Sequence, residues 1–395
     1  MSRPEVLFVQ PSVQPPGGGN GVAAWMLEAL APRANVTLLS MAPFDAEETD
    51  RYYGTHLAGK GIQNIVYGTE VMAFLAKLPL PTALMRLHLM MRGARQHAQG
   101  PYDLVCSAFD EQDFGRPCIE YIHYPWNLYP RPDAPPNWNQ SKLLAYVLKV
   151  YNWVCRQVSG FRVKNRPQNL TLVNSHWTGR KTQQVYAGNQ FQVLYPPALA
   201  EIVSDDRSRR EARFLSIGRV APSKEWEKLI DIVAALRRRG HDVGLTLAGS
   251  RDDRAYEEVI RKRMAEEGDW IRLITDFSRE DMLELMKTHR YGLHGMRDEH
   301  YGMAVAELLL GGCLTMVPND GGQVEIVTDP RLRYDTPGEA AEKWHKVLSE
   351  PALEAQLLAD QLATREKLTK ERFLREFNAI VDRCLEVGVE RALTS

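Results

Sequence analysis

The sequence is poor in the residues that build a disulfide framework or a structural zinc site. Its 395 residues include five cysteines, with no Cys-x-x-Cys pair and no zinc-like spacing to histidine. An odd, scattered set of this kind indicates free thiols in a reducing compartment and argues against a disulfide-stapled scaffold. The five are Cys106, Cys118, Cys155, Cys313 and Cys384.

Long apolar runs are also missing. No stretch reaches the roughly 18 apolar residues that a membrane-spanning helix needs. The first residues, Met-Ser-Arg-Pro-Glu-Val-Leu-Phe-Val, lead directly into a predicted strand and do not resemble a signal peptide. We therefore expect a cytoplasmic protein, peripheral at the inner face of a membrane if it meets one.

Carboxylates are absent from a long central stretch. No Asp or Glu occurs between Asp133 and Glu201, whereas eight Lys and Arg do. Residues 1–200 carry 18 Lys+Arg against 13 Asp+Glu, and residues 201–395 carry 31 against 37, so the net charge of −1 conceals an asymmetry. A basic half favours an anionic partner such as a membrane surface, or a solvated basic face that aids solubility. We expect no nucleic-acid partner.

Apolar runs of strand length alternate with helical patterns along the chain. Strands are predicted at residues 5–10, 36–40, 103–107, 117–123, 171–175 and 192–195, with a helix at about 22–30. A second series predicts strands at 214–217, 243–248, 270–274, 291–294 and 314–317, with helices at about 225–239, 255–267, 279–288 and 302–310. This alternation predicts an α/β fold with two Rossmann-like parallel-sheet domains facing a central cleft.

The domain boundaries follow from where the two series stop. Residues 1–198 are predicted to form the first domain, and the polar residues 199–212 a linker. Residues 213–365 are predicted to form the second domain, and 366–395 a C-terminal helix that packs back on the first.

The segment from Tyr291 to Glu307 is the most informative motif. Glu299 and Glu307 stand eight residues apart, on either side of Gly302, which precedes a strongly helix-forming run. The free N–H groups at such a helix start favour a diphosphate, and Glu307 could accept hydrogen bonds from ribose hydroxyls. The alternative is a buried helix with two solvated glutamates.

Two cations follow the first strand of the second series. Arg219 and Lys224 lie just after Gly218, where they could clamp a diphosphate at the carboxyl end of the strand. They could equally be surface cations.

The first series carries a glycine-rich loop and a histidine. The loop at residues 17–21 lacks the G-x-G-x-x-G spacing of an NAD site, but it could approach a phosphate or sugar closely. His123 follows a strand in Tyr-Ile-His-Tyr-Pro, where it could contact a sugar or play a structural part.

A basic amphipathic helix is predicted at Lys142–Ser159. Lys142, Lys149, Asn152, Arg156 and Ser159 form one polar stripe, opposite a broad apolar face. Residues 85–95 are similarly apolar and basic. Such segments can lie on an anionic bilayer, or form core helices with a solvated basic edge.

Together these motifs resemble the retaining glycosyltransferases of family four, which share the GT-B fold. The Glu299–Glu307 pair, the Gly218–Lys224 segment, the glycine loop and His123 match the family in order. Gly-Leu-His-Gly-Met-Arg-Asp-Glu-His-Tyr-Gly at 292–302 looks most similar to the dolichol-pathway α-1,2-mannosyltransferases, as do Val-Asn-Ser-His-Trp-Thr at 173–178 and Asn-Asp-Gly-Gly at 319–322.

The resemblance implies a role for each matching residue. Glu299 would contact donor-sugar hydroxyls, Glu307 would hold the ribose, and Arg219 and Lys224 would neutralise the diphosphate. Backbone N–H groups of Gly302, Met303 and Ala304 would bind phosphate. Gly18 and Gly19 would approach the donor from the other domain, with His123 near the reacting sugar. The resemblance implies no metal and no cofactor beyond the nucleotide sugar.

Three features depart from the family pattern. Lys224-Glu225 replaces the usual Lys-Gly, Asn20-Gly21 replaces a Glu-Arg pair, and an N-terminal membrane anchor is missing. The shape of the loop at Glu225 and the contacts to the acceptor therefore do not carry over.

The resemblance thus implies a retaining, metal-independent hexosyltransferase. It would move a hexose from GDP-mannose or a UDP-glucose-type donor to a glycan or lipid-linked sugar. A nucleotide-sugar epimerase and a non-catalytic nucleotide-sugar-binding protein are the alternatives.

Overall fold

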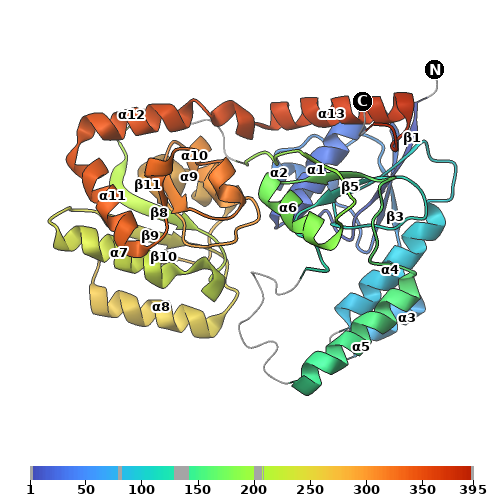
Figure 1. The fold of residues 1–395 in the computed structure, drawn as a ribbon, viewed down its shortest axis with the longest axis horizontal. Helices are drawn as coiled ribbons and strands as arrows, with labels where there is room; N and C mark the ends of the chain where they lie inside the picture. Colours follow the sequence, from blue (N-terminus) through green and yellow to red (C-terminus); the bar gives the residue numbers. More distant parts are fainter. Residues whose placement is uncertain (1–2, 79–81, 129–141, 200–206, 208, 393–395) are drawn as a thin grey trace. The chain divides into compact units, whose positions relative to one another are not determined.

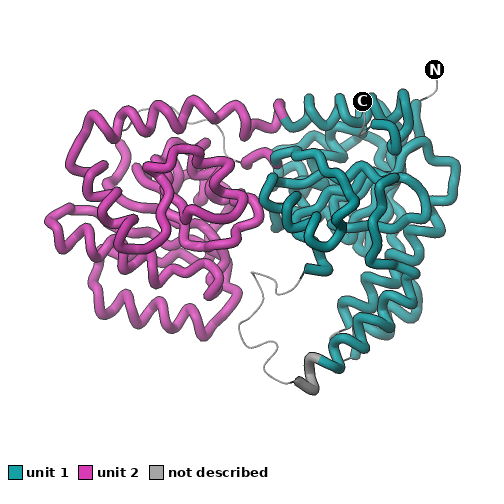
Figure 2. Tube along the Cα trace, viewed as in Figure 1, with its two compact units in different colours: residues 1–195, 373–395 teal, residues 196–372 magenta. Residues whose placement is uncertain are grey.

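The computed structural model describes residues 3–78, 82–128, 142–199, 207 and 209–392. The chain divides into two compact units, one of residues 1–195 with 373–395 and the other of residues 196–372 (Figure 2). Each unit is built on its own parallel sheet (Figure 1). The prediction of an α/β fold with two Rossmann-like parallel-sheet domains is confirmed.

The first unit contains a seven-stranded sheet in the order β3-β2-β1-β4-β5-β6-β7, with every pair parallel. Edge strand β3 was not predicted, because its sequence, Gln-Asn-Ile-Val, is half polar and none of its residues is fully buried. The strands are β1 (Glu5–Val9), β2 (Asn35–Ser40), β3 (Gln63–Val66), β4 (Leu104–Ser107), β5 (Ile119–Ile122), β6 (Leu170–Val173) and β7 (Phe191–Val193). The helices are α1 (Gly18–Leu30), α2 (Ala46–Tyr53), α3 (Glu70–Lys77), α4 (Ala83–His97), α5 (Lys142–Ser159) and α6 (His176–Val185).

The second unit contains a six-stranded parallel sheet in the order β10-β9-β8-β11-β12-β13. Its strands are β8 (Glu211–Ile217), β9 (Gly244–Ala248), β10 (Ile271–Ile274), β11 (His289–Leu293), β12 (Leu314–Pro318) and β13 (Arg333–Tyr334). Its α-helices are α7 (Trp226–Arg238), α8 (Arg254–Glu267), α9 (Arg279–Thr288), α10 (Met303–Leu310), α11 (Pro337–Ser349) and α12 (Pro351–Leu362). Short 3₁₀ turns are η1 (Pro222–Lys224), η2 (Gly322–Glu325), η3 (Pro330–Leu332) and η4 (Arg365–Leu368). The rings of Phe214, Tyr291 and Trp344 pack edge-on or tilted in the core beside this sheet.

Both sheets reverse their strand order beside their first strand. In the first unit β1 lies between β2 and β4, and in the second β8 lies between β9 and β11. In open α/β sheets, ligands bind at such a reversal, outside the carboxyl ends of the strands. The predicted motifs follow β1 and β5 in one unit and β8 and β11 in the other, so those of the second unit flank its reversal.

The unit boundaries differ from the predicted ones. The first unit ends at residue 195, and the second begins at 196 and continues to 372. Leu368 is buried in the second unit, where its carbonyl accepts a hydrogen bond from the Ala198 N–H, so both residues stay with that unit. Of the predicted linker, residues 200–206 and 208 lie outside the described part of the chain, and Glu211 already belongs to β8.

The C-terminal helix α13 (Lys370–Val387) enters the first unit at residue 373. The ring of Phe373 lies edge-on to Trp25 of α1, with 6.4 Å between ring centroids. Arg33 pairs with Asp382 and donates to the side chain of Asn378. Apolar and ionic contacts therefore hold the last helix against the unit that contains the N-terminus.

Helix α5 begins and ends where it was predicted, and part of its predicted apolar face is exposed, whereas one end of its predicted polar stripe is buried. Ser159, in the predicted polar stripe, is buried and lies 2.8 Å from Nδ1 of His88 on α4. The Tyr151 hydroxyl accepts from the Met85 N–H. Helix α5 therefore turns a mixed polar face towards α4, and five large apolar side chains are exposed: Tyr146, Val147, Val150, Trp153 and Val154. The side chains at 142–145 lie outside the described residues.

Candidate functional site

Glu299 is the centre of a small ionic cluster in the second unit. The Lys224 ammonium donates to Glu299 Oε2 over 2.7 Å, and His294 Nε2 lies 3.1 Å from the same oxygen. Because an ionised carboxylate can only accept, His294 donates this hydrogen bond. We call these three residues the Glu299 cluster. It joins the loop after β8 to the loop after β11, the two strands at the reversal of the sheet.

The cluster keeps Glu299 ionised. Burial opposes ionisation, but the Lys224 charge and the His294 hydrogen bond outweigh it and hold the pKa of Glu299 well below its usual range. Burial lowers the pKa of His294, although its hydrogen bond to Glu299 acts in the opposite direction. A neutral histidine therefore holds an anionic carboxylate in place beside a lysine.

The turn after β12 fixes the backbone of Glu299. The Gly322 N–H donates to the Glu299 carbonyl over 2.7 Å. Gly321 has φ +79°, and a Cβ there would lie 2.6 Å from the same carbonyl oxygen, so only glycine fits this close approach. Gln323 Nε2 also donates to the Met296 carbonyl over 2.8 Å. The Asn-Asp-Gly-Gly motif thus supports the loop that carries Glu299.

Arg219 and Lys224 do not share a carboxylate. Arg219 pairs with Asp252 over 2.7 Å, and its side chain is 53% exposed. Lys224, five residues later, is 15% exposed and pairs with Glu299. Glu225 takes the position of the usual glycine and has φ +51°, in the left-handed region that glycine adopts most readily. The departure from Lys-Gly therefore puts a non-glycine residue in a left-handed backbone conformation.

The start of α10 has no side-chain cap. Gly302 precedes the helix with φ +103°, and within the described residues the helix has no side-chain cap hydrogen bond. Uncapped N–H groups and the positive end of the helix dipole suit an anionic group. The backbone N–H groups of Gly302, Met303 and Ala304 thus remain the predicted phosphate contacts.

Glu307 is buried and ion-paired, which contradicts the alternative of a solvated glutamate. Its side chain is 8% exposed, and Oε1 lies 3.1 Å from NH1 of Arg279, the first residue of α9. Burial raises the pKa of Glu307, and the Arg279 charge opposes this effect. Arg279 had no predicted role, because neither its type nor its position 28 residues before Glu307 signals the pair.

In the first unit, Gly18 and Gly19 form the first turn of α1 rather than a loop. Gly17 precedes the helix with φ +133°, and the Gly21 N–H donates to its carbonyl over 3.0 Å. The helix start has no side-chain cap. A Cβ on Gly19 would lie 3.4 Å from Nε2 of His123. The structure thus brings two of the predicted first-unit features, the glycines and His123, into contact range.

His123 is held by residues that directly follow β4 and β6. Its Nε2 lies 3.0 Å from the Ala108 carbonyl, and its own carbonyl accepts from Asn174 Nδ2 over 3.1 Å. Burial lowers the pKa of His123, opposed by the charge of Asp110. The imidazole is therefore neutral, with Nε2 protonated because a carbonyl only accepts.

Asp110 fixes the loop that contains His123, which the sequence did not indicate. Its Oδ1 accepts from the N–H groups of His123 (2.7 Å) and Tyr124 (3.1 Å), and Oδ2 accepts from the Trp126 indole. It adopts φ +51°, a conformation that aspartate tolerates better than most residues. Asp110 is therefore a positioning residue, which holds the backbone of His123 in place.

The described residues contain neither a metal-ligand cluster nor a membrane-spanning helix. Among the described residues, no group of three or more His, Cys, Asp or Glu side chains is placed to hold a metal ion. Within the same residues, no helix combines the length and apolarity needed to cross a bilayer.

The sequence is similar to known glycosyltransferases. Residues 202–366 match the family described as glycosyl transferases group 1. The chain is 25% identical over 256 residues to the GDP-Man:Man(3)GlcNAc(2)-PP-Dol alpha-1,2-mannosyltransferase of Neurospora crassa, covering 55% of this chain and 46% of that protein. The chain thus spans about half the length of the curated relatives it matches first.

Solved structures agree on the fold. Anabaena HepE in complex with UDP and glucose has a TM-score of 0.65 at 15% identity, covering 96% of this chain and 99% of the other. WaaG, a glycosyltransferase involved in lipopolysaccharide biosynthesis, has a TM-score of 0.65 at 15% identity, covering 95% and 99%. The chain therefore has the GT-B fold, and its sequence at residues 202–366 matches the glycosyl transferases group 1 family.

Proposed function

We propose that the protein transfers a hexose from a nucleotide-diphosphate sugar to a glycan or lipid-linked sugar, with retention at the anomeric carbon. The observation that carries this proposal is the Glu299 cluster, which lies at the sheet reversal, where open α/β sheets bind ligands. An anionic carboxylate held by a lysine and a neutral histidine is suited to grip sugar hydroxyls. It is poorly suited to act as a general base, because its pKa is depressed.

The remaining residues have complementary roles. Lys224 and Arg219 stabilise the negative charge that develops on the departing diphosphate, and the uncapped start of α10 binds phosphate. Glu307 accepts from ribose hydroxyls. The predicted donor contacts of Gly18 and Gly19, and the predicted place of His123 near the reacting sugar, remain part of this proposal.

The donor we propose is GDP-mannose. Support comes from the Neurospora relative, whose name specifies GDP-mannose. The structure of HepE holds UDP and glucose, so a UDP-glucose-type donor is the rival. Titration calorimetry of the purified protein with GDP and with UDP distinguishes them. Absence of binding to both would contradict the proposed function.

The chemistry needs no metal in this proposal, because Lys224, Arg219 and the helix start supply the positive charge that would otherwise come from a cation. Transferase activity should survive EDTA and should not rise when Mg²⁺ or Mn²⁺ is added. A strict requirement for either ion would exclude this part of the proposal. An epimerase would instead alter the donor sugar with no acceptor present.

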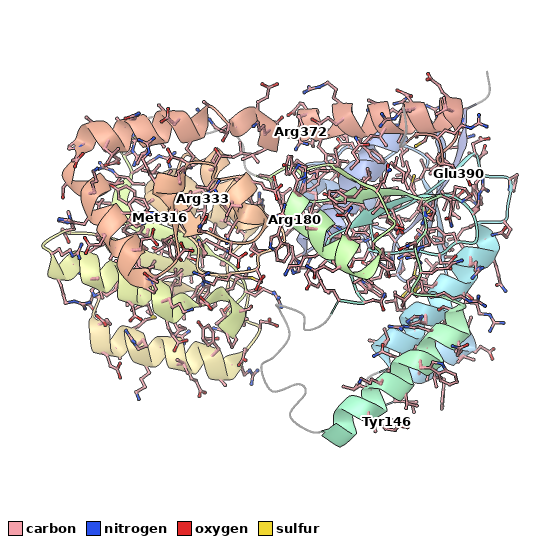
Figure 3. The ribbon with its side chains drawn as sticks, viewed as in Figure 1. Tyr146, Arg180, Met316, Arg333, Arg372 and Glu390 are labelled. Atoms are coloured by element: carbon pink, nitrogen blue, oxygen red, sulfur yellow. The ribbon has the colours of Figure 1, made fainter. Side chains whose placement is uncertain are left out.

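The partner on the acceptor side is an anionic membrane surface, which would place the protein peripherally at the inner face of a membrane. Support comes from the exposed apolar face of α5, where Tyr146 is 66% and Trp153 61% exposed (Figure 3). Phe74 on α3 is 63% exposed. Helix α3 packs against α4, which in turn packs against α5 (Figure 1). We call Tyr146, Val147, Val150, Trp153, Val154, Val71 and Phe74 the apolar face.

The basic character of helices α3, α4 and α5 favours an anionic membrane surface. Helices α3, α4 and α5 contain seven Lys and Arg but one carboxylate, Glu70. Lys77 and Lys149 are exposed on the same helices as the apolar face. Exposed aromatic side chains flanked by cations match an anionic bilayer, which accepts the rings at its interface and attracts the cations.

Vesicle flotation tests this partner. Trp153→Ser combined with Phe74→Ser should lower binding to anionic vesicles by about tenfold or more, because each large apolar side chain contributes roughly 1.5–3 kcal/mol when buried. Val259→Ser is the matched control, because Val259 is 43% exposed on the second unit. Failure of the wild type to float with anionic vesicles at low salt would remove the membrane from the proposal.

A further inference from the structure

Arg279 is a buried cation beside the predicted ribose-binding carboxylate. It opens α9, directly after the loop that follows β10, at the carboxyl edge of the second sheet. Its side chain is only 9% exposed, and NH1 lies 3.1 Å from Glu307 Oε1. The glycosyltransfer chemistry described above gives this arginine no task.

One nitrogen of the guanidinium is buried without a partner. NH1 is engaged by Glu307 and lies 3.8 Å from the Met282 sulfur. NH2 is buried, and none of the described residues accepts a hydrogen bond from it. A buried charged donor of this kind is costly, and a bound ligand is one way to satisfy it.

Arg279 and Glu307 place a hydrogen-bond donor and a hydrogen-bond acceptor side by side. Glu307 accepts, so it suits the vicinal hydroxyls of a ribose. Arg279 can only donate, so whatever adjoins that ribose must present an acceptor. In a nucleoside diphosphate the ribose adjoins the diphosphate and the base; the diphosphate is assigned above to Lys224, Arg219 and the start of α10, which leaves the base for Arg279. Guanine O6 and uracil O4 are oxo acceptors, whereas adenine and cytosine carry an amino group at the same ring position.

We propose that Arg279 is a specificity-determining residue that donates to the exocyclic oxo oxygen of the nucleobase while Glu307 holds the ribose. The site then accepts guanosine and uridine diphosphates and disfavours adenosine and cytidine diphosphates, because an amino group would set donor against donor. The inference rests on the proposed function, since it assumes that a nucleotide occupies the second unit.

The test measures dissociation constants of GDP, UDP, ADP and CDP by titration calorimetry, first on the wild-type chain. At least one oxo-base nucleotide should bind about tenfold or more tightly than both amino-base nucleotides. Arg279→Met should remove most of this preference and leave ADP and CDP affinities little changed. Arg279→Lys keeps a positive charge beside Glu307. It replaces Arg279→Met in the test if the methionine variant fails to fold. Glu307→Gln is the matched control, which should weaken all four nucleotides by a similar factor and preserve their ranking.

The outcomes separate this inference from the proposed function. Binding of none of the four nucleotides by the wild type would contradict the proposed function itself. Binding without a preference for oxo bases would overturn the role of Arg279 and leave the glycosyltransferase proposal standing. A uniform loss across all four nucleotides in both arginine variants would also overturn it, because Arg279 would then only position Glu307.

Discussion

Replacing Lys224 by methionine is the sharpest perturbation of the Glu299 cluster. Methionine keeps most of the length and apolar bulk of lysine but removes the ammonium that lies 2.7 Å from Glu299 Oε2. Of the side-chain bonds that the described residues make to Glu299, the one from His294 would then remain, while the Glu299 side chain stays 16% exposed. The variant thus isolates the charge that holds the pKa of Glu299 down.

The expected loss of stability follows from burial. Removing one partner of a fully buried ion pair costs about 3–5 kcal/mol. The Lys224 and Glu299 side chains are 15% and 16% exposed, and His294 remains, so we expect about 2–3 kcal/mol at neutral pH. Loss of a charge that stabilises the departing diphosphate should also lower turnover by about 10²–10³-fold.

The pH dependence has a definite sign. The folded-state pKa of Glu299 lies well below its ordinary value of 4.5, so the pair stabilises the fold above that value. This contribution is lost as the pH falls through the folded pKa. The difference between wild type and Lys224→Met should therefore be largest near pH 7 and shrink below about pH 4.

Urea unfolding followed by tryptophan fluorescence at pH 7 and pH 4, together with a transferase assay, measures these effects. Lys228→Met is the matched control, because Lys228 also pairs over 2.7 Å, with Glu225, but is 47% exposed. An exposed pair contributes about 0–1 kcal/mol. If Lys224→Met is no less stable and no less active than Lys228→Met, the cluster does not have the role assigned to it.

Three further changes test the backbone and the buried carboxyls. Gly302→Ala should cost about 1–3 kcal/mol in a thermal melt, because φ is +103° and the new Cβ would lie 3.2 Å from Gln323 Cβ; no loss would mean that the strain is absent. Glu225→Gly should stabilise by up to about 1 kcal/mol by relieving φ +51°, and a destabilised variant would contradict this. Burial raises the pKa of Glu111 to about 7, so its folding contribution is lost as the pH rises from about 4.5 through 7. Glu111→Gln should therefore be more stable than wild type at pH 8, by up to about 3 kcal/mol, and a flat wild-type stability profile from pH 5 to 8 would refute this.

Much of the fold could be predicted from local patterns. Buried strands such as β1 and β9 are short apolar runs followed by turn residues. Helix α9 was predicted at about 279–288 and has these bounds in the structure, where a Ser278 cap fixes its start. Strand β3 escaped because an edge strand with polar residues carries little of this signal. Helix α5 was predicted to the residue, but which of its faces is exposed was not.

The sequence by itself determined the order of elements, the parallel sheets and the position of the Glu299–Glu307 motif, because these depend on hydrophobic periodicity and on residues close together in the chain. Only the tertiary structure decided the partners: Lys224 with Glu299, 75 residues away, Arg219 with Asp252, and Arg279 with Glu307. It also decided that the apolar side of α5 is exposed. Such pairs depend on which strands become neighbours and in what register. The local sequence around each residue does not indicate its distant partner.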